Sequence, residues 1–331
     1  MKLYKATGER IFKEQELENN PPEGYIRLKL GLILPSDTDV AIFEGKAGVN
    51  YPLVPCRMAT AAVSEDRDEY GLKLGAKVIL NPYIDTAGDT ETGYAPPRLY
   101  GIDEDGFLRD FISVPIDNIV PFPENVREEE GVFTDVVAIA LKTIKSLKVK
   151  KGDYVAIIGG SVLNLIIAQL AIYYQAIPIL ITSDEKYLSL AAASGVYYAL
   201  NEAKENVSQR VRLVTGGRMA DHTVIQALTG VTPNYLYTIT AEGGTSVIVG
   251  THTAFTPKLE CDISEIAAKN LTVTGVTHAR EEFNAAINLL AQKILKFDGF
   301  IDKTVPLKES ETLFKELSRD GAVSVVAAIK A

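Results

Sequence analysis

The stretch Tyr154-Val155-Ala156-Ile157-Ile158-Gly159-Gly160-Ser161 decides the fold of this chain. Its first five residues form a short apolar run, which is typical of a strand buried on both faces of a sheet. A glycine-rich turn and a long apolar segment to about Tyr174 follow, and the segment has the length of a helix. A strand, a glycine-rich turn and a helix in this order predict a dinucleotide site, because the N-terminus of a helix attracts a pyrophosphate.

The phosphate contacts are expected on the backbone N–H groups of the turn and the first helical residues. We predict that these cofactor-binding residues are Gly159, Gly160, Ser161, Val162 and Leu163. The usual pattern is Gly-x-Gly-x-x-Gly, but here Ser161 and Asn164 stand in for its second and third glycines. The serine hydroxyl could donate to a phosphate, and the asparagine predicts a looser fit of the helix on the strand. An α/β unit that has lost its nucleotide is the alternative.

The residue that contacts the adenosine ribose is expected about 20 to 25 residues further on, at the end of the second strand. Residues 177–182 form that predicted strand, and Ser183 and Asp184 follow it. A carboxylate there would bind the ribose diol and repel a 2′-phosphate, whereas a hydroxyl would tolerate the phosphate with Lys186 as its partner. The cofactor is therefore NAD or NADP, and the choice between them stays open.

Strands and helices alternate over the second half of the chain, which predicts βαβ units and a parallel sheet. One of the predicted strands there is residues 235–239. The first 125 residues differ, because residues 25–30 alternate apolar and charged side chains as a half-buried strand does. Residues 77–80 and 111–114 are further short strands there. We predict helices over residues 132–147 and 281–295. The predicted class is α/β, with a β-rich domain and a doubly wound parallel-sheet domain.

Composition excludes several classes of protein. The chain has 331 residues and a formal charge of −9, so nucleic acid and anionic membranes are not expected partners. Its two cysteines, Cys56 and Cys261, cannot form a disulfide framework, which predicts a cytoplasmic protein. The N-terminus lacks the apolar segment of a signal peptide. Residues 162–181 are apolar enough to suggest a membrane span, but polar residues interrupt them, and we interpret them as a buried helix and strand.

Several short segments carry a resemblance that runs over nearly the whole length. Residues 36–39 are Ser-Asp-Thr-Asp and stand where the relatives have Cys-Gly-Thr-Asp, and residues 75–78, Gly-Ala-Lys-Val, resemble Gly-Asp-Arg-Val. Residues 105–111 resemble the segment Gly-Gly-Phe-Ala-Glu-Tyr, and residues 151–155 are also in family positions. In these segments the chain resembles the medium-chain dehydrogenase/reductase superfamily, in particular its zinc-dependent alcohol, sorbitol and threonine dehydrogenases.

The resemblance implies a domain organisation, an activity and partners. Residues 1–130 and 278–331 would form a GroES-like catalytic domain, and residues 131–277 a Rossmann domain for the dinucleotide. The implied activity is that of an NAD(P)-dependent oxidoreductase whose small-molecule substrate lies in the cleft between the domains. The resemblance also implies a homodimer or homotetramer formed by edge pairing of strands of the cofactor domain.

The zinc ligands of these relatives are missing. The positions of their Cys, His and Cys or Glu ligands fall on Ser36, Arg57 and Asp135. A serine hydroxyl is a poor zinc ligand and an arginine is none, so the resemblance implies a member without catalytic or structural zinc. Cys56 aligns with a glycine and is not counted as a ligand.

The catalytic zinc ion polarises a carbonyl and stabilises an alkoxide, and a fixed cation could perform part of this function. Arg57 would supply that charge, with Asp39 as its ion-pair partner and Asp135 completing the site or acting as acid or base. Lys142 is a further cation, and the resemblance implies that Thr38 acts in proton relay. The catalytic candidates are thus Thr38, Asp39, Arg57 and Asp135. The alternative is that Arg57 and the two acids form a salt bridge that only plugs the vacated site.

The remaining polar candidates are weaker. Gly250 ends a predicted strand near the expected place of the nicotinamide, and His252 follows it, although a structural loop histidine is the simpler interpretation. His222 and His278 are interpreted as structural. A solvated loop accounts for the acidic residues Asp85, Asp89 and Glu91.

Three functional hypotheses follow from these patterns. The first is a cytoplasmic, zinc-independent, NAD(P)-dependent oxidoreductase that acts on an alcohol and a carbonyl, or on an activated double bond. The second is a catalytically silent relative that works as a nucleotide sensor or scaffold, and the two missing glycines and three missing ligands favour it. The third is a metalloenzyme with displaced ligands.

Overall fold

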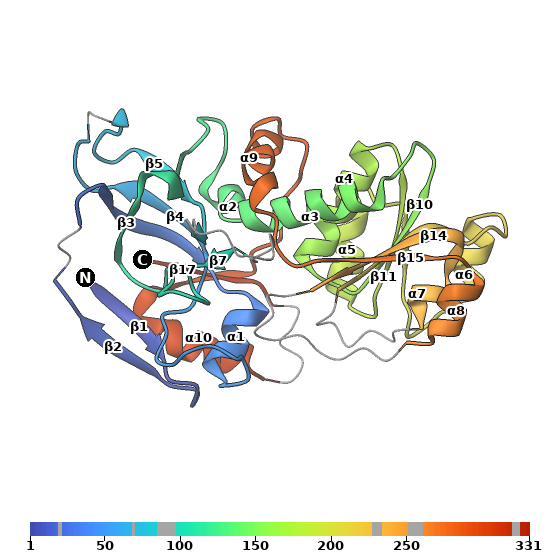
Figure 1. Cartoon of the computed structure of the whole chain (residues 1–331), viewed down its shortest axis with the longest axis horizontal. Helices are drawn as coiled ribbons and strands as arrows, with labels where there is room; N and C mark the ends of the chain where they lie inside the picture. Colours follow the sequence, from blue (N-terminus) through green and yellow to red (C-terminus); the bar gives the residue numbers. More distant parts are fainter. Residues whose placement is uncertain (19–21, 68–69, 85–96, 227–233, 251–260, 320–324) are drawn as a thin grey trace, which may run out of the picture. The chain divides into compact units, whose positions relative to one another are not determined.

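The computed structural model describes residues 1–18, 22–67, 70–84, 97–226, 234–250, 261–319 and 325–331 (Figure 1). The chain divides into two compact units, which are described separately. Unit 1 contains Met1–Asp135, Phe283–Gln292 and Phe297–Ala331. Unit 2 contains Val136–Glu282 and Lys293–Lys296.

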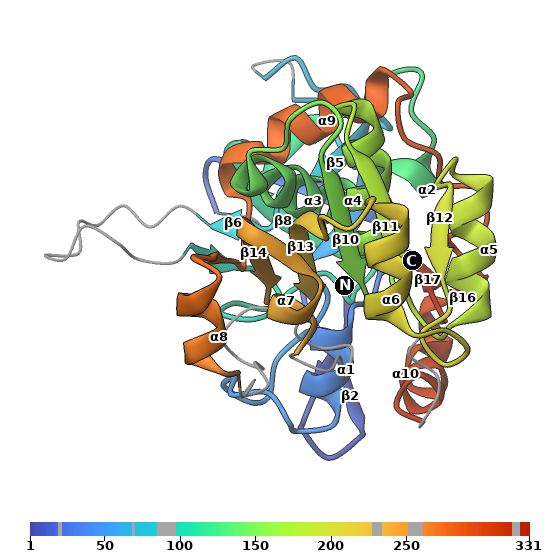
Figure 2. The same cartoon turned by 90° about the vertical axis from the view of Figure 1, so that its right-hand side faces the viewer.

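Unit 2 is built on a six-stranded sheet in which every neighbouring pair of strands is parallel. Its strands are β10 (Tyr154–Ile158), β11 (Ile177–Ile181), β12 (Tyr198–Leu200), β13 (Ala220–Gln226), β14 (Thr240–Val249) and β15 (Thr272–Val276). Their order is β12-β11-β10-β13-β14-β15, and Figure 2 shows β12, β11, β10, β13 and β14 side by side. The chain runs outward in one direction from β10 and then in the other from β13. This order is that of a doubly wound dinucleotide-binding sheet, in which ligands bind where the winding reverses, here at β10 and β13.

Helices cover this sheet. They are α3 (Thr134–Leu147), α4 (Val162–Tyr173), α5 (Glu185–Ala193), α6 (Val207–Val214), α7 (Tyr235–Thr238) and α8 (Ile263–Ala268). On one face, Val207 and Val211 of α6 and Leu236 of α7 pack against alternate residues of the strands, such as Ile158 and Ile179. The strands are apolar on both faces because both faces are covered, as the run before Gly159 predicts.

Two predictions for unit 2 are decided here. Residues 162–181 form α4 and β11, as expected, and no helix in the described part of the chain is long and apolar enough to cross a bilayer. The strand predicted for residues 235–239 is wrong, because these residues form the short helix α7. The carbonyl oxygen of Leu236 accepts hydrogen bonds from the hydroxyls of Thr240 (2.7 Å) and Ser246 (3.1 Å), and these bonds stabilise the helical turn.

Unit 1 contains a seven-stranded sheet and two small hairpins. The sheet runs β16-β17-β3-β4-β5-β9, and β8 also pairs with β3. Its strands are β3 (Tyr25–Leu34), β4 (Met58–Val63), β5 (Lys77–Leu80), β8 (Phe111–Pro115), β9 (Ile119–Pro121), β16 (Lys303–Pro306) and β17 (Ala327–Lys330). The hairpins are β1 (Lys2–Ala6) with β2 (Phe12–Glu16), and β6 (Tyr83–Ile84) with β7 (Arg98–Leu99).

The helices of unit 1 pack through aromatic side chains. They are α1 (Asp37–Phe43), α2 (Glu128–Gly131), α9 (Phe283–Ala291) and α10 (Ser310–Leu317). The ring of Phe12 lies 4.8 Å from that of Phe43 in α1 and 4.9 Å from that of Phe314 in α10. This cluster joins the N-terminal hairpin to two helices that are distant in the sequence, and it fixes the position of α1.

The strands predicted at residues 25–30, 77–80 and 111–114 are confirmed as β3, β5 and β8. The helix predicted over residues 132–147 is α3, which begins at Thr134. The one predicted over residues 281–295 is shorter, because α9 ends at Ala291 and Lys293 has a left-handed φ of 55°. The predicted class, α/β with a doubly wound parallel sheet, is confirmed.

Candidate functional site

The turn after β10 adopts the geometry that its glycines permit. Gly159 has a φ of +105°, in the left-handed region that favours glycine. A Cβ atom added at Gly160 would lie 2.7 Å from the ring of Tyr187 and 2.8 Å from Oγ1 of Thr182. The second glycine is therefore required by close packing of the turn against β11 and α5.

Ser161 is the N-cap of α4. Its Oγ accepts a hydrogen bond from the backbone N–H of Asn164 (3.1 Å) and donates one to Oε1 of Gln226 at the end of β13 (2.6 Å). The hydroxyl hydrogen therefore goes to Gln226. The first helical turn carries no acidic side chain, and the N–H groups of Val162 and Leu163 have no partner within the helix. These donors fit a pyrophosphate.

Asn164 ties the helix to the strand. It is 0% exposed, and its Nδ2 donates to the carbonyl oxygens of Ile158 (3.0 Å) and Gly159 (2.9 Å). The looser fit predicted at this position is wrong, because the amide replaces the close glycine contact with two hydrogen bonds across the turn. No hydrogen bond reaches Oδ1 of Asn164, which is buried.

Asn164→Ala should destabilise the protein, because two buried carbonyl oxygens lose their donor. We expect a loss of about 2–3 kcal/mol in the free energy of unfolding, measured by urea denaturation. The control is Gln209→Ala on the exposed face of α6, which should change stability by less than about 0.5 kcal/mol. A loss at Asn164 as small as the one at Gln209 would contradict this role.

The end of β11 holds the three candidates for cofactor selectivity. Ser183 is exposed, and Asp184 is the N-cap of α5, with Oδ1 accepting from the backbone N–H of Lys186 (2.9 Å). The ammonium of Lys186 lies 5.2 Å from the centre of the Tyr187 ring. The carboxylate of Asp184 thus has a structural use, and its second oxygen carries the charge that a 2′-phosphate would meet.

Asp184→Asn removes the negative charge but keeps the helix cap, because asparagine is as good an N-cap residue as aspartate. We expect the ratio of the Kd for NADPH to the Kd for NADH to fall about threefold to tenfold, since one negative charge is removed from the strand end. Fluorescence titration with both nucleotides measures the ratio. An unchanged ratio would place the ribose away from Asp184.

The ends of the other strands lie at the same edge of the sheet as this turn. Gly250 follows β14, and its N–H donates to the carbonyl oxygen of Val276 in β15 (2.9 Å). Gln226 ends β13, and the sequence analysis missed it. Only its place at the end of an apolar strand could have indicated it, because its partner Ser161 is 65 residues away. His252, Asp85, Asp89 and Glu91 lie outside the described residues.

Unit 1 places Ser36, Thr38 and Asp39 at the start of α1, where Asp39 also contacts Cys56. The carboxylate of Asp39, 2% exposed, accepts from the backbone N–H (2.7 Å) and hydroxyl (2.6 Å) of Ser36, and from the backbone N–H of Cys56 (2.7 Å). Burial raises the pKa of Asp39, although these hydrogen bonds and the charge of Arg57 oppose the rise. Thr38, beside it, is also buried.

Cys56 has a backbone conformation that suits glycine. Its φ is +71°, which agrees with its alignment to a glycine of the relatives. A Cβ atom at Gly106 would lie 2.3 Å from the carbonyl oxygen of Cys56, so the backbone here is closely packed. Burial and the nearby Asp39 raise the pKa of the Cys56 thiol well above its usual value. The thiolate form, which binds metals, is therefore disfavoured.

Arg57 forms its ion pair with Asp135. Its Nε donates to Oδ2 of Asp135 (3.0 Å), while the hydroxyl of Tyr83 donates to Oδ1 (2.8 Å). The expected Asp39–Arg57 ion pair is therefore wrong, because both oxygens of Asp39 are occupied by Ser36 and Cys56. Tyr83 follows Asn81-Pro82 in the sequence and was not among the predicted site residues.

The guanidinium of Arg57 keeps its terminal amino groups available. Its side chain is 11% exposed, and among the described residues only Nε has a hydrogen-bond partner. Burial lowers the pKa of Arg57, but the charges of Asp135, Tyr83 and Asp39 outweigh it and raise the pKa, so the side chain stays cationic. Lys142 does not join this cluster, because its ammonium pairs with Glu281 (2.6 Å).

A catalytic zinc ion does not fit this donor set. The three ligand positions of the relatives carry a serine that caps a helix, an arginine and the aspartate that binds it: Ser36, Arg57 and Asp135. Among the residues that the structure describes, no group of three or more His, Cys, Asp or Glu side chains could hold a metal ion. The cluster instead presents one fixed cation supported by a carboxylate and a phenol.

Comparisons with known proteins show which proteins this chain resembles. Residues 163–292 match the family described as zinc-binding dehydrogenase. The chain is 26% identical over 259 residues to an uncharacterised zinc-type alcohol dehydrogenase-like protein of Haemophilus influenzae, a match that covers 75% of this chain and 73% of that one. It is 24% identical over 305 residues to D-xylulose reductase of Morganella morganii, with 86% and 87% covered.

The fold is shared with solved dehydrogenases. A structure from Sinorhizobium meliloti 1021, described as a zinc-binding dehydrogenase bound to NADP, superimposes with a TM-score of 0.87 at 21% identity. The match covers 100% of this chain and 99% of that one. These matches support the resemblance to the medium-chain dehydrogenase/reductase superfamily. The protein is an oxidoreductase of the dehydrogenase/reductase type.

Proposed function

We propose that the protein is a zinc-independent, NAD(P)-dependent member of the medium-chain dehydrogenase/reductase superfamily. Its reaction would interconvert an alcohol and a carbonyl, or reduce an activated carbon–carbon double bond. The observation that carries the proposal is the guanidinium of Arg57, which is bound through Nε to Asp135 and has its terminal amino groups unpaired among the described residues. By the resemblance, this cation would stand where zinc-type relatives have a metal ligand.

The residues proposed to bind the cofactor belong to unit 2. The N–H groups at the start of α4 would hold the pyrophosphate, and Ser183 or Asp184 would contact the adenosine ribose. Gly250 would leave room for the nicotinamide ring, since it carries no side chain. When bound, the nicotinamide supplies or accepts the hydride. The NADP of the Sinorhizobium meliloti relative supports this assignment.

The residues proposed to act on the substrate belong to unit 1. A guanidinium that donates two N–H groups to a carbonyl oxygen stabilises the negative charge that develops there during hydride transfer. Asp135 would position Arg57 through its hydrogen bond with Nε, and Tyr83 would hold the carboxylate of Asp135 by donating to its other oxygen. Thr38 would exchange the proton with the alkoxide, the role that the resemblance gives to it. The proton of Tyr83 is already donated to Asp135 and is not used in this scheme.

Metal removal combined with cofactor titration tests the proposal. We expect the purified protein to change the fluorescence of NADH or NADPH and to oxidise it with members of a panel of aldehydes, ketones and enones. Dialysis against EDTA should leave both properties unchanged. Stoichiometric zinc whose removal abolishes turnover would overturn the zinc-free assignment. Cofactor binding without turnover on any member of the panel would instead favour the catalytically silent relative.

A further inference from the structure

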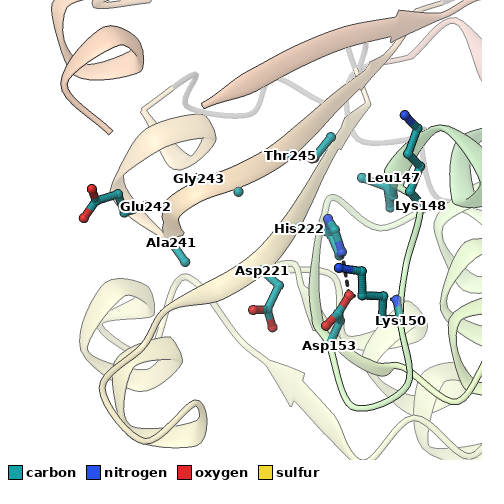
Figure 3. A pocket seen from close by; sticks show the side chains of 11 residues that line it. Leu147, Lys148, Lys150, Asp153, Asp221, His222, Ala241, Glu242, Gly243 and Thr245 are labelled. Atoms are coloured by element: carbon teal, nitrogen blue, oxygen red, sulfur yellow. Dashed lines mark hydrogen bonds and ion pairs between the residues drawn. The ribbon is translucent and has the colours of Figure 1, made fainter. Parts of the chain in front are cut away.

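Unit 2 has a pocket of about 340 Å³ at the edge of the sheet where β10, β13 and β14 begin (Figure 3). Asp153 precedes β10, Asp221 and His222 begin β13, and Thr245 lies in β14. Because all strands of this sheet are parallel, these amino-terminal ends lie opposite the carboxyl ends that carry Gly159 and Gly250. The pocket is thus separate from the nucleotide turn.

His222 is the buried polar group of this pocket. It is 8% exposed, and its Nε2 lies 2.9 Å from Oδ2 of Asp153. The backbone N–H of Lys150 donates to the same oxygen (2.7 Å), which fixes the carboxylate in place. A carboxylate acceptor places the proton of neutral imidazole on Nε2, so Nδ1 carries a lone pair. This Nδ1 is buried, and none of the described residues forms a hydrogen bond with it.

A cation lies at the same pocket. The side chain of Lys150 extends toward His222 and Asp153, whereas that of Glu242 points away from them (Figure 3). No ion pair of Lys150 occurs within the described part of the chain. The pocket therefore offers an ammonium donor and a ring-nitrogen acceptor, and both lack a protein partner among the described residues.

Charged side chains of both signs line this pocket. The lining includes three carboxylates, Asp153, Asp221 and Glu242, and two lysines, Lys148 and Lys150, so acidic side chains outnumber the lysines by one. One carboxylate oxygen of Asp221 accepts from the backbone N–H of Tyr154 (2.8 Å), and the other is free to accept a second bond. A ligand with only an anionic group would be poorly matched to this charge, and one with an additional donor or positive charge would fit it.

We propose that this pocket binds a small carboxylic acid that carries a hydrogen-bond donor on the adjacent carbon, as 2-hydroxy and 2-amino acids do. The carboxylate pairs with Lys150, and the hydroxyl or ammonium group donates to Nδ1 of His222. An ammonium group can also pair with Asp221, so 2-amino acids bind more tightly than 2-hydroxy acids. The volume suits molecules of this size, at the lower end of small-molecule sites.

Three isosteric acids test the proposal: L-alanine, L-lactate and propionate differ only in bearing an ammonium, a hydroxyl or a hydrogen on the second carbon. The readout is the ring signals of the histidines in two-dimensional NMR spectra, which is independent of enzymatic activity. The chain has only three histidines, and the His222 signals are identified as those missing from a His222→Gln protein. Alanine and lactate should shift the His222 signals saturably, and propionate should not.

Lys150→Met and Lys151→Met form the matched pair of variants, because both side chains are exposed and only Lys150 lines the pocket. We expect Lys150→Met to weaken alanine and lactate binding about tenfold or more, the value of one charge-assisted hydrogen bond. Lys151→Met should bind as the wild type does. Lactate alone at His222 would identify hydroxy acids as the ligand class, and alanine alone would identify amino acids. The proposal is overturned if all three acids shift His222 equally, if none does, or if the two lysine variants bind alike.

Discussion

Arg57→Met is expected to slow hydride transfer by about a hundredfold to a thousandfold, with the larger part of the loss in kcat. Methionine fills much of the same space but donates no hydrogen bond, so the charge that develops on the substrate oxygen loses its fixed cation. The affinity for NADH or NADPH should stay within a factor of about two, because the proposed phosphate-binding residues are in unit 2. Stopped-flow oxidation of the nucleotide with a substrate from the panel measures the rate.

Two further variants separate catalysis from folding at this position. Arg57→Met alone leaves the buried carboxylate of Asp135 without its cation, so the double variant Arg57→Met/Asp135→Asn is made in parallel to remove both charges. Arg57→Lys should recover part of the rate, because lysine keeps the charge but not the fork of donors. Arg98→Met removes an exposed arginine and should be active. A double variant with wild-type kcat would mean that the ion pair only plugs the site.

Asp135→Asn should give the largest loss of stability among these changes, about 3–5 kcal/mol. The side chains of Asp135 and Arg57 are 3% and 11% exposed, so the variant leaves a guanidinium largely out of water with no compensating charge. Asparagine can still accept from Tyr83, and the loss therefore reports on the charge. Urea unfolding followed by circular dichroism measures it, since the chain has no tryptophan for fluorescence.

The comparison for this second prediction is a surface pair in the same unit. Glu104→Gln breaks the exposed ion pair with Arg98 and should cost less than about 1 kcal/mol. Arg57→Met/Asp135→Asn should lose much less stability than the sum of its two single variants, since each single change leaves one unpaired buried charge. Additive losses would show that the two side chains do not act as a pair.

The sequence by itself predicted the architecture of this protein, because local patterns carry it. The apolar run before Gly159 and the strand at residues 177–182 are buried in the sheet, so each is visible as a short apolar segment. Departures from the zinc-ligand pattern were also visible, since they are changes of residue type at single positions. Short elements such as α7 were missed, because four residues are too few to show a helical period.

The partners within the candidate site were decided only by the tertiary structure. Arg57 and Asp135 are 78 residues apart, and Tyr83 and Asp135 are 52 apart, so no spacing rule connects them. From the sequence, Asp39 was an equally good partner for Arg57. In the folded chain, the backbone N–H groups of Ser36 and Cys56 donate to Asp39. The guanidinium of Arg57 therefore pairs with Asp135 instead. A side chain binds what the fold brings within about 3 Å, and that distance is set by the packing of distant segments.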